Sequence, residues 1–505
     1  DGVSLTTFVG ISTTNEQYES FGVSGSDFIV PFLLNVKNTK NQGSSYSFWE
    51  KQINSAYGSA EIGFMDYAYL TVTARNDWFS TLSLKDKVAP NNDLYTSASL
   101  ALVVSDALDL GDAISFLKFR AGYSQVAGGA DSPYALSLSY GIYGQGHLGA
   151  SLGNISGGTI PNSEITPFEK NETEFGMDLR LFDNKLSIDA TYYDNETLGD
   201  IVGVSASATS GFGSALANLG NISNKGIELL VKGTVIQSDD FSWDASFNYT
   251  NNTSEVVATN DTGGNISMDE PRSRNLRVTH IVGEQYGALY GSSYVRDLNG
   301  AVVHEVVNGI PIPVIGDRKI LGFGVAPTQV SFGSTFRYKD FNANILIEGK
   351  SGGQIYSGSN AFLIRNGHHK KTVPAGGREA GFVPKGVVGG SATTAGTAIT
   401  TSIPQNQQED YYRRTYVIAE EAIQNSDYMR LRQLSIGYNF PSSTLEGTFI
   451  SKASISLIGR NLFFLSNSTD NIDPESAYNS GNSAGLEWFG LPVPRTIGLN
   501  LNLKF

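Results

Sequence analysis

The stretch "TEFGMDLRLFDNKLSIDATYY", residues 173–193, contains two short segments in which every second residue is apolar. The turn residues "FDNK" separate the two segments. Successive side chains of a β-strand point to opposite faces, so a period of two predicts a β-hairpin with one apolar and one polar face. The apolar positions are Phe175, Met177, Leu179 and Leu181 in the first segment, and Leu186, Ile188, Ala190 and Tyr192 in the second.

The same alternation recurs along the whole chain. It ends at residues 496–505, "TIGLNLNLKF", where four aliphatic side chains alternate with polar residues or glycine and Phe505 comes last. The pattern predicts roughly fourteen strands of about ten residues, the length of a tilted strand that crosses a bilayer. The predicted strands lie near 3–11, 54–64, 67–78, 94–104, 115–125, 173–182, 186–193, 226–233, 241–250, 330–338, 341–350, 427–440, 451–462 and 496–505.

The connections between these strands alternate between short and long. Residues Lys339–Asp340 are typical of a two-residue hairpin turn. Short turns on one side and long loops on the other are the pattern of an outer-membrane barrel, and this parity places Phe505 at the periplasmic rim. The short connections are 65–66, 183–184, 236–240, 339–340 and 441–450; the long ones are 12–53, 126–170, 195–223, 258–326, 353–426 and 463–494.

Composition narrows the class of protein. The 505 residues include 56 Gly, 27 Phe and 24 Tyr, and only 17% are charged, which favours many short strands and tight turns. A net charge of −14 argues against nucleic acid as the main partner. The absence of cysteine excludes disulfides and thiolate chemistry. No run approaches 18 apolar residues, so a membrane crossing would require a closed barrel.

Aromatic residues gather at the strand ends beside the short turns, which is typical of the aromatic girdle at a membrane interface. We therefore predict an all-β protein, a transmembrane antiparallel β-barrel. An array of β-sandwich domains is the alternative, because an alternating strand also suits a half-buried soluble sheet. The aromatic residues are Phe182, Tyr192, Phe241, Trp243, Tyr338, Phe341, Tyr438, Phe440 and Phe505.

Several segments, in this order, resemble the SusC/RagA-type family of TonB-dependent outer-membrane transporters of Bacteroidota. They include "NETEFGMDLRLFDNKLSIDATYYDNETLGDIV" at 171–202, "NLGNISNKGIELLVKG" at 218–233, "SDYMRLRQLSIGYNFP" at 426–441, "GRNLFFLSNSTDNIDPE" at 459–475 and "PVPRTIGLNLNLKF" at 492–505. Members of this class have about 22 strands around a plugged lumen. The resemblance implies that residues 1–505 are the C-terminal part of such a barrel, about its last fourteen strands. It also implies that the plug and the N-terminal domains lie outside this chain.

The resemblance further implies a function and partners. The function would be TonB-dependent import of a large nutrient, a glycan or a peptide, across the outer membrane, with no cofactor and no enzymatic step. A SusD-like surface lipoprotein would act as a lid, the TonB–ExbB–ExbD complex would act through the missing N-terminal region, and a homodimer of transporter–lid pairs would be compatible with this scheme. An iron-chelate (siderophore) receptor, a passive porin and a surface adhesin remain alternatives.

Candidate substrate contacts are aromatic residues in the predicted extracellular loops. Tyr411 and Tyr412 in "EDYYRRTY", and Tyr478 and Trp488 in "PESAYNSGNSAGLEW", could stack on sugar rings or on peptide side chains. The alternative is that they pack loops together or touch the lid. The histidine pair in "NGHHKK" has no third ligand at a metal-site spacing, and "RDLNGAV" at 296–302 predicts a simple turn rather than a calcium loop.

Two arginines do not fit the alternation. Arg430 and Arg432 share parity with Leu434 and Ile436, which are predicted to face lipid. A β-bulge that reverses the parity, or a position above the apolar band, would explain them. Contact with lipid phosphates is the functional alternative.

Overall fold

The computed structural model describes residues 2–85, 87, 89–142, 147–156, 158–206, 208–259, 264–269, 275–476 and 484–505. Within these residues the main feature is an antiparallel sheet of 14 strands, which follow one another in sequence order. Its strands are β1 (Val3–Phe28), β2 (Thr39–Phe64), β3 (Ala68–Phe79), β4 (Asn92–Val103), β5 (Ile114–Gly128), β9 (Phe168–Leu181), β10 (Leu186–Leu198), β13 (Asn221–Gln237), β14 (Phe241–Ala258), β21 (Thr328–Tyr338), β22 (Phe341–Ser351), β27 (Tyr428–Asn439), β28 (Lys452–Asn467) and β30 (Thr496–Lys504).

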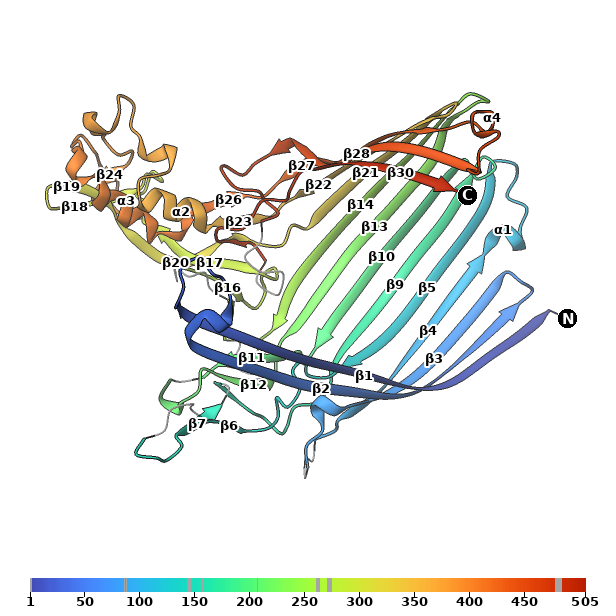
Figure 1. Ribbon diagram of the computed structural model, residues 1–505, viewed down its shortest axis with the longest axis horizontal. Coiled ribbons are helices and arrows are strands. Elements are labelled where there is room, and N and C mark those ends of the chain that lie inside the picture. Colours follow the sequence, from blue (N-terminus) through green and yellow to red (C-terminus); the bar gives the residue numbers. More distant parts are fainter. Residues whose placement is uncertain are drawn as a thin grey trace. The chain divides into compact units, whose positions relative to one another are not determined.

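Each predicted strand coincides with one strand of this sheet, so the prediction of an antiparallel all-β architecture is confirmed. The predicted two-residue turn at Lys339–Asp340 is also confirmed, because Tyr338 pairs directly with Phe341 across it. Lys339 adopts φ 51°, the left-handed conformation that tight hairpin turns use. Strands β13, β14, β21, β22, β27 and β28 run side by side in Figure 1.

The prediction of a long loop over residues 12–53 is wrong. β1 and β2 each continue for 26 residues and pair in one register from Val3–Phe64 to Phe28–Thr39. The actual connection is residues 29–38, which contain the 3₁₀ helix η1 (Val36–Asn38). At about 3.3 Å per residue these strands span roughly 85 Å, which exceeds what a bilayer crossing needs. Few residues of this hairpin are apolar, so the alternation is hard to recognise there. For this reason the sequence pattern predicted a loop where the structure has two strands.

A row of aromatic residues crosses four neighbouring strands beside the short turns. Phe241 pairs with Tyr338, Tyr338 with Phe341, and Phe341 with Tyr438. Trp243 stacks on Phe336 at 5.7 Å, and its indole nitrogen donates to the Ser334 hydroxyl at 2.7 Å. The indole thereby supplies a partner for a hydroxyl on the apolar face. The structure places these side chains as an aromatic girdle requires.

The chain divides into two compact units. The first comprises residues 1–102, 120–173 and 195–221, and the second comprises residues 103–119, 174–194 and 222–505. In the first unit, a core of Phe79, Leu82, Ala130, Leu136 and Ile165 forms beside the 3₁₀ helix η2 (Ser80–Leu82). Its loops add the sheet β6 (Ser139–Ile142) with β7 (Gly153–Ser156), and the sheet of β8 (Thr159–Ile160), β11 (Ile201–Ser205) and β12 (Ser214–Asn218), beside η3 (Ala208–Ser210).

In the second unit, the long connections fold into a loop layer, defined here as residues 264–269, 275–327, 352–427, 468–476 and 484–495. Figure 1 shows its elements gathered at one end of β21, β22 and β27. Its sheets are β15 (Ile266–Asp269), β16 (Leu276–His280), β17 (Ala288–Tyr294) and β20 (Ile315–Phe323); β18 (Val303–Val307), β19 (Ile310–Pro313), β24 (Val387–Val388) and β25 (Thr397–Ala398); and β23 (Gln354–Ser357), β26 (Ile423–Asn425) and β29 (Leu486–Glu487).

Two helices contribute to the core of the loop layer. They are α2 (Gly358–Arg365) and α3 (Gln408–Tyr416), and Leu276, Leu289, Tyr356 and Leu486 are almost fully buried around them. The remaining short helices are α1 (Val104–Ala107), α4 (Ser442–Leu445), η4 (Lys370–Thr372), η5 (Arg378–Ala380), η6 (Gln405–Gln407) and η7 (Ala419–Ala422). These connections are therefore packed structure, which their richness in Gly, Ser, Asn and Thr does not indicate.

The buried carboxylate of Glu487 joins the last long connection to the connection that contains α2. Glu487 is 1% exposed and accepts hydrogen bonds from the Ser357 hydroxyl at 3.1 Å and from the Ser359 amide at 3.2 Å. Both donors lie at the N-terminal end of α2, where backbone amides lack partners within the helix. A carboxylate is stabilised there by the helix dipole as well. This bond joins residues that are 128 positions or more apart in sequence.

Candidate functional site

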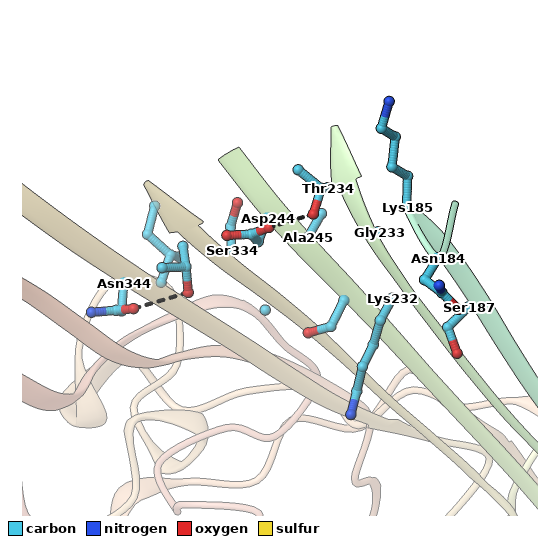
Figure 2. A pocket seen from close by; sticks show the side chains of 14 residues that line it. Asn184, Lys185, Ser187, Lys232, Gly233, Thr234, Asp244, Ala245, Ser334 and Asn344 are labelled. Atoms are coloured by element: carbon cyan, nitrogen blue, oxygen red, sulfur yellow. Dashed lines mark hydrogen bonds between the residues drawn. The ribbon is translucent and has the colours of Figure 1, made fainter. Parts of the chain in front are cut away.

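The polar face of the second unit's sheet carries a first cavity near the short turns. It has a volume of about 440 Å³ and is lined by residues of β10, β13, β14, β21 and β22. Figure 2 shows Lys232, Thr234, Asp244 and Asn344 around it, with Thr234 and Asp244 directed toward each other. These residues belong to the polar set of the alternation, so the cavity lies on the face opposite the aromatic row.

Hydrogen bonds between neighbouring strands hold these polar side chains in place. The Thr234 hydroxyl donates to Asp244 at 2.8 Å, and Arg337 approaches the same carboxylate at 3.3 Å. One strand further, the Thr335 hydroxyl donates to Asn344 at 2.9 Å, and the Asn344 amide donates to Ser435 at 3.1 Å. Cross-strand pairs of this kind stabilise a sheet face. The result is an ordered row of amide, hydroxyl and carboxylate groups.

A second cavity lies on the same face at the loop end of the strands. Its volume is about 360 Å³, and its walls include Glu348, Lys350, Arg432 and Glu475. Arg432 contacts Glu348 at 2.6 Å and Glu475 at 2.8 Å. Positive and negative groups thus neutralise each other around this cavity. A charge-balanced polar cavity suits a hydrophilic ligand without a strong net charge.

A local irregularity places the two arginines here. The pairing of β27 with β22 shifts between Leu346 and Ile347, and its pairing with β28 shifts on both sides of Arg430. Such a bulge inserts a residue and reverses the parity of the strand. Arg430 consequently pairs with Glu348 on the polar face and is only 3% exposed. The predicted bulge is confirmed.

The protonation of Glu475 follows from the same contacts. Burial tends to raise the pKa of its carboxyl, but hydrogen bonds from Arg432 at 2.8 Å and from Tyr428 at 2.8 Å outweigh burial and lower the pKa. Glu475 is therefore an anion at neutral pH and a permanent partner for both arginines. Among the described residues, no group of three or more His, Asp or Glu side chains is arranged to hold a metal ion.

The predicted contact residues Tyr411 and Tyr412 lie next to each other on α3. The Tyr411 ring is parallel to that of His304, with centroids 6.2 Å apart, and the Tyr412 ring stacks on Phe382 at 5.7 Å. Tyr412 is 9% exposed. Both rings therefore pack the loop layer together in this structure. Their role in substrate contact stays a prediction.

The other two predicted contact residues are Trp488, which the structure describes, and Tyr478, which it does not. Trp488 packs against the loop-layer core and meets Phe489 edge to face at 5.9 Å. A Cβ at Gly358 would overlap its ring, so that glycine is needed for the close approach. Tyr478 lies outside the described residues. The structure brings Tyr411 and Tyr412 together and places Trp488 in a separate cluster.

The remaining sequence motifs have structural roles. Asp297 in "RDLNGAV" accepts hydrogen bonds from the amides of Asn299 and Ala301, both at 2.9 Å, which closes the predicted turn. His369 caps η4 by accepting from the Lys371 amide at 3.1 Å. The groups that sequence reasoning missed are Glu475 and Asp473, the partners of the arginines. Their spacing from Arg430 in sequence contains no signal for this contact.

Comparison with known proteins identifies the class of fold. The sequence profile described as "TonB dependent receptor-like, beta-barrel" matches residues 2–462, which is most of the chain.

The chain belongs to the TonB-dependent receptor β-barrel family.

Named relatives place this barrel near the SusC/RagA type. TonB-dependent receptor P3 of Formosa agariphila is 26% identical over 500 residues, which cover 92% of this chain and 46% of that protein. TonB-dependent receptor SusC of Bacteroides thetaiotaomicron is 24% identical over 300 residues, or 57% of this chain and 27% of SusC. The solved structure of the RagAB peptide transporter has the same fold, with a TM-score of 0.76, 17% identity, and coverage of 100% of this chain and 54% of that one.

These findings confirm the SusC/RagA-type resemblance and the barrel fold. The chain spans about half the length of the curated relatives it matches. The family consists of outer-membrane receptors that transport rather than catalyse, so this receptor barrel is an outer-membrane protein and not an enzyme. In the described parts of the chain, no helix is long and apolar enough to cross a membrane.

Proposed function

We propose that this chain forms the channel wall of a TonB-dependent importer for a large hydrophilic nutrient, an oligosaccharide or a peptide. One observation carries the proposal: the polar face of the sheet has two cavities, of about 440 and 360 Å³, whose walls combine charged, amide and hydroxyl side chains. An uncharged solute that forms hydrogen bonds loses little free energy when it exchanges its bonds with water for bonds with such a surface. The barrel supplies a path and no covalent chemistry.

The proposal includes partners outside this chain. In it, the chain is the barrel part of a receptor about twice as long, whose other part includes the plug and engages the TonB–ExbB–ExbD complex. A SusD-like lipoprotein closes the extracellular mouth, and pairs of receptor and lid associate as dimers. Similarity to SusC and to RagAB supports this scheme. Energy coupling is needed because a plugged barrel does not conduct by itself.

We also propose that Tyr411, Tyr412, Tyr478 and Trp488 contact substrate through the loop layer. Aromatic rings offer a flat apolar face to a sugar or a peptide side chain. Tyr411→Ala and Trp488→Ala should then raise the Kd of the full-length receptor for its substrate while its unfolding temperature changes little. If both variants lose stability and retain the affinity for substrate, these residues serve packing alone.

The function is tested by deleting the gene of the full-length receptor in its own host. We expect growth on one defined glycan or peptide source to fail, and transport to stop when the proton gradient is dissipated. Uptake that persists without the gradient would indicate a passive porin. A growth defect confined to iron limitation would indicate an iron-chelate receptor. Unchanged growth on all glycans and peptides would overturn the proposal.

A further inference from the structure

The extended hairpin β1–β2 carries a third cavity, in the first unit. Its volume is about 400 Å³, and its walls combine hairpin residues 15–17 and 50–52 with Ser80, Thr81, Pro133 and Tyr134. Glu16 and Lys51, which pair across the two strands, lie on the hairpin face opposite Val9 and Ile11. The cavity therefore lies on the face of the hairpin opposite these aliphatic side chains.

Exposed aromatic rings accompany this cavity. Tyr134 is 59% exposed at its edge and adopts φ 62°, a conformation that costs energy for a residue other than glycine. Next to the cavity on the same face, Tyr18 and Trp49 stack with ring centroids 5.5 Å apart and planes 15° from parallel. Tyr18 is 44% exposed. Because these rings are exposed beside a polar cavity, they do not belong to a hydrophobic core.

The polar groups of the cavity are internally balanced. Lys51 lies 2.9 Å from Glu16 and 5.7 Å from the centre of the Trp49 ring. Glu16 thus neutralises the charge of Lys51, and this pair leaves no excess charge on the cavity face of the hairpin. The Gln52 backbone amide donates to the Ser80 hydroxyl at 2.8 Å, which fixes the loop after β3 against the hairpin. Residues 15, 17 and 52 also border the cavity, but their side chains alternate to the opposite face of the hairpin.

We propose that this cavity is a capture site for a neutral sugar ring of an oligosaccharide. Sugars present C–H groups on their ring faces and hydroxyl pairs at their edges. An aromatic ring packs on the ring face, while carboxylate and ammonium groups form hydrogen bonds with the hydroxyl pairs. Tyr134 and the Tyr18–Trp49 pair supply the rings, and Glu16 and Lys51 supply the hydrogen bonds. A peptide needs apolar pockets for its side chains, which this wall lacks.

This inference rests on the proposed function, because it assigns one side of the glycan-or-peptide choice to a specific surface. The site lies on the upper half of β1 and β2, well beyond the residues that a bilayer crossing requires.

The test measures binding by the purified full-length receptor in detergent. The probes are four neutral hexasaccharides, namely maltohexaose, cellohexaose, mannohexaose and xylohexaose, and a tryptic digest of casein as the peptide alternative. Binding is followed by calorimetry for the wild type and for Tyr134→Ala and Trp49→Ala. Tyr46→Ala is the matched control, because Tyr46 is 64% exposed on the opposite face of the same hairpin.

We expect at least one hexasaccharide to bind. Tyr134→Ala and Trp49→Ala should each raise its Kd roughly tenfold, equivalent to about 1.4 kcal/mol. Tyr46→Ala should leave Kd unchanged. Tyr134→Phe, which retains the ring, should bind within about twofold of the wild type, and this variant separates loss of the ring from loss of the fold.

Three results would overturn the inference: no hexasaccharide binds, only the peptide digest binds, or Tyr46→Ala weakens binding as much as Tyr134→Ala does. These results are distinguishable from failure of the proposed function. If uptake of a nutrient still depends on the receptor while the hairpin variants bind normally, the site is wrong and the importer stands.

Discussion

The guanidinium of Arg430 lies 2.6 Å from the carboxylate of Asp473, and each side chain is less than a tenth exposed. Arg430 also contacts Glu475 at 2.6 Å and covers the Phe464 ring at 3.9 Å. The strand end of β27 and the segment after β28 are thereby joined through one buried ion network. This contact exists only because the bulge turns Arg430 to the polar face.

Removing one partner of this buried pair should cost more than removing an exposed one. Asp473→Ala leaves the Arg430 charge under-compensated, and we expect a loss of about 3 kcal/mol in the free energy of unfolding of the loop layer. Limited proteolysis of residues 468–476 measures it. The control is Asp240→Ala, since Asp240 is 3.8 Å from Lys339 in an exposed pair that contributes less than about 1 kcal/mol. Equal protease sensitivity of the two variants would contradict this reasoning.

The two faces of the last strand should respond differently to charge. Leu499 is 70% exposed and pairs with Leu457, while Asn500 is its neighbour on the other face. An arginine on the lipid face of a barrel costs about 2–4 kcal/mol near the bilayer centre. Leu499→Arg should therefore reduce the amount of folded receptor in the outer membrane, measured by heat-modifiable gel mobility. Asn500→Arg should assemble normally, and the reverse order would invert our assignment of the faces.

Position 358 should accept no residue larger than glycine, because Gly358 lies against the Trp488 ring. A Cβ at this position would overlap the indole ring and the Glu487 carbonyl, so Gly358→Ala must displace one of them. Overpacking of this kind costs typically about 1–3 kcal/mol. We expect a lower unfolding temperature and a changed tryptophan emission spectrum. Gly498→Ala is the control, because a Cβ there meets no atom within 4 Å; a matching loss in that variant would refute the packing argument.

The loop layer should lose stability in acid. His280 is 6% exposed, and burial lowers the pKa of its imidazole to about 4 from an ordinary value near 6.5. The unfolded chain therefore binds the proton first, and stability falls as the pH drops from about 6.5 to about 4. The expected loss is on the order of 3 kcal/mol. This loss of stability is complete below about pH 4, and there is no loss above about pH 6.5.

Hydrogen exchange of β16 and β17 at pH 7.5 and pH 4.5 measures this loss. His280→Phe keeps a ring against Tyr286, whose centroid lies 4.6 Å from that of His280, and should remove most of the acid sensitivity. His368→Gln, at an exposed position, should leave it unchanged. Acid sensitivity that survives in His280→Phe would assign the effect to other groups, with buried His304 the first to examine.

The period of two determined much of this protein from sequence alone. It placed the fourteen strands of the main sheet, the turn at Lys339–Asp340 and the division into an apolar and a polar face. Each of these is a local property, because side-chain direction in a strand depends only on whether a position is odd or even. For the same reason the polar lining around Asp244 and Asn344 was predictable as a face, although not as a cavity.

Only the tertiary structure decided the rest. The length of β1 and β2 depends on pairing between residues such as Phe28 and Thr39, which have weak strand patterns of their own. The bulge at Arg432 turns Arg430 toward Asp473 and Glu475, more than 40 positions away, which hold it there. The loop layer is held by contacts such as Ser357 with Glu487, 130 positions apart. Contacts of this kind form because distant groups must satisfy their charge and hydrogen bonds when they are buried, and no local pattern encodes which partner they find.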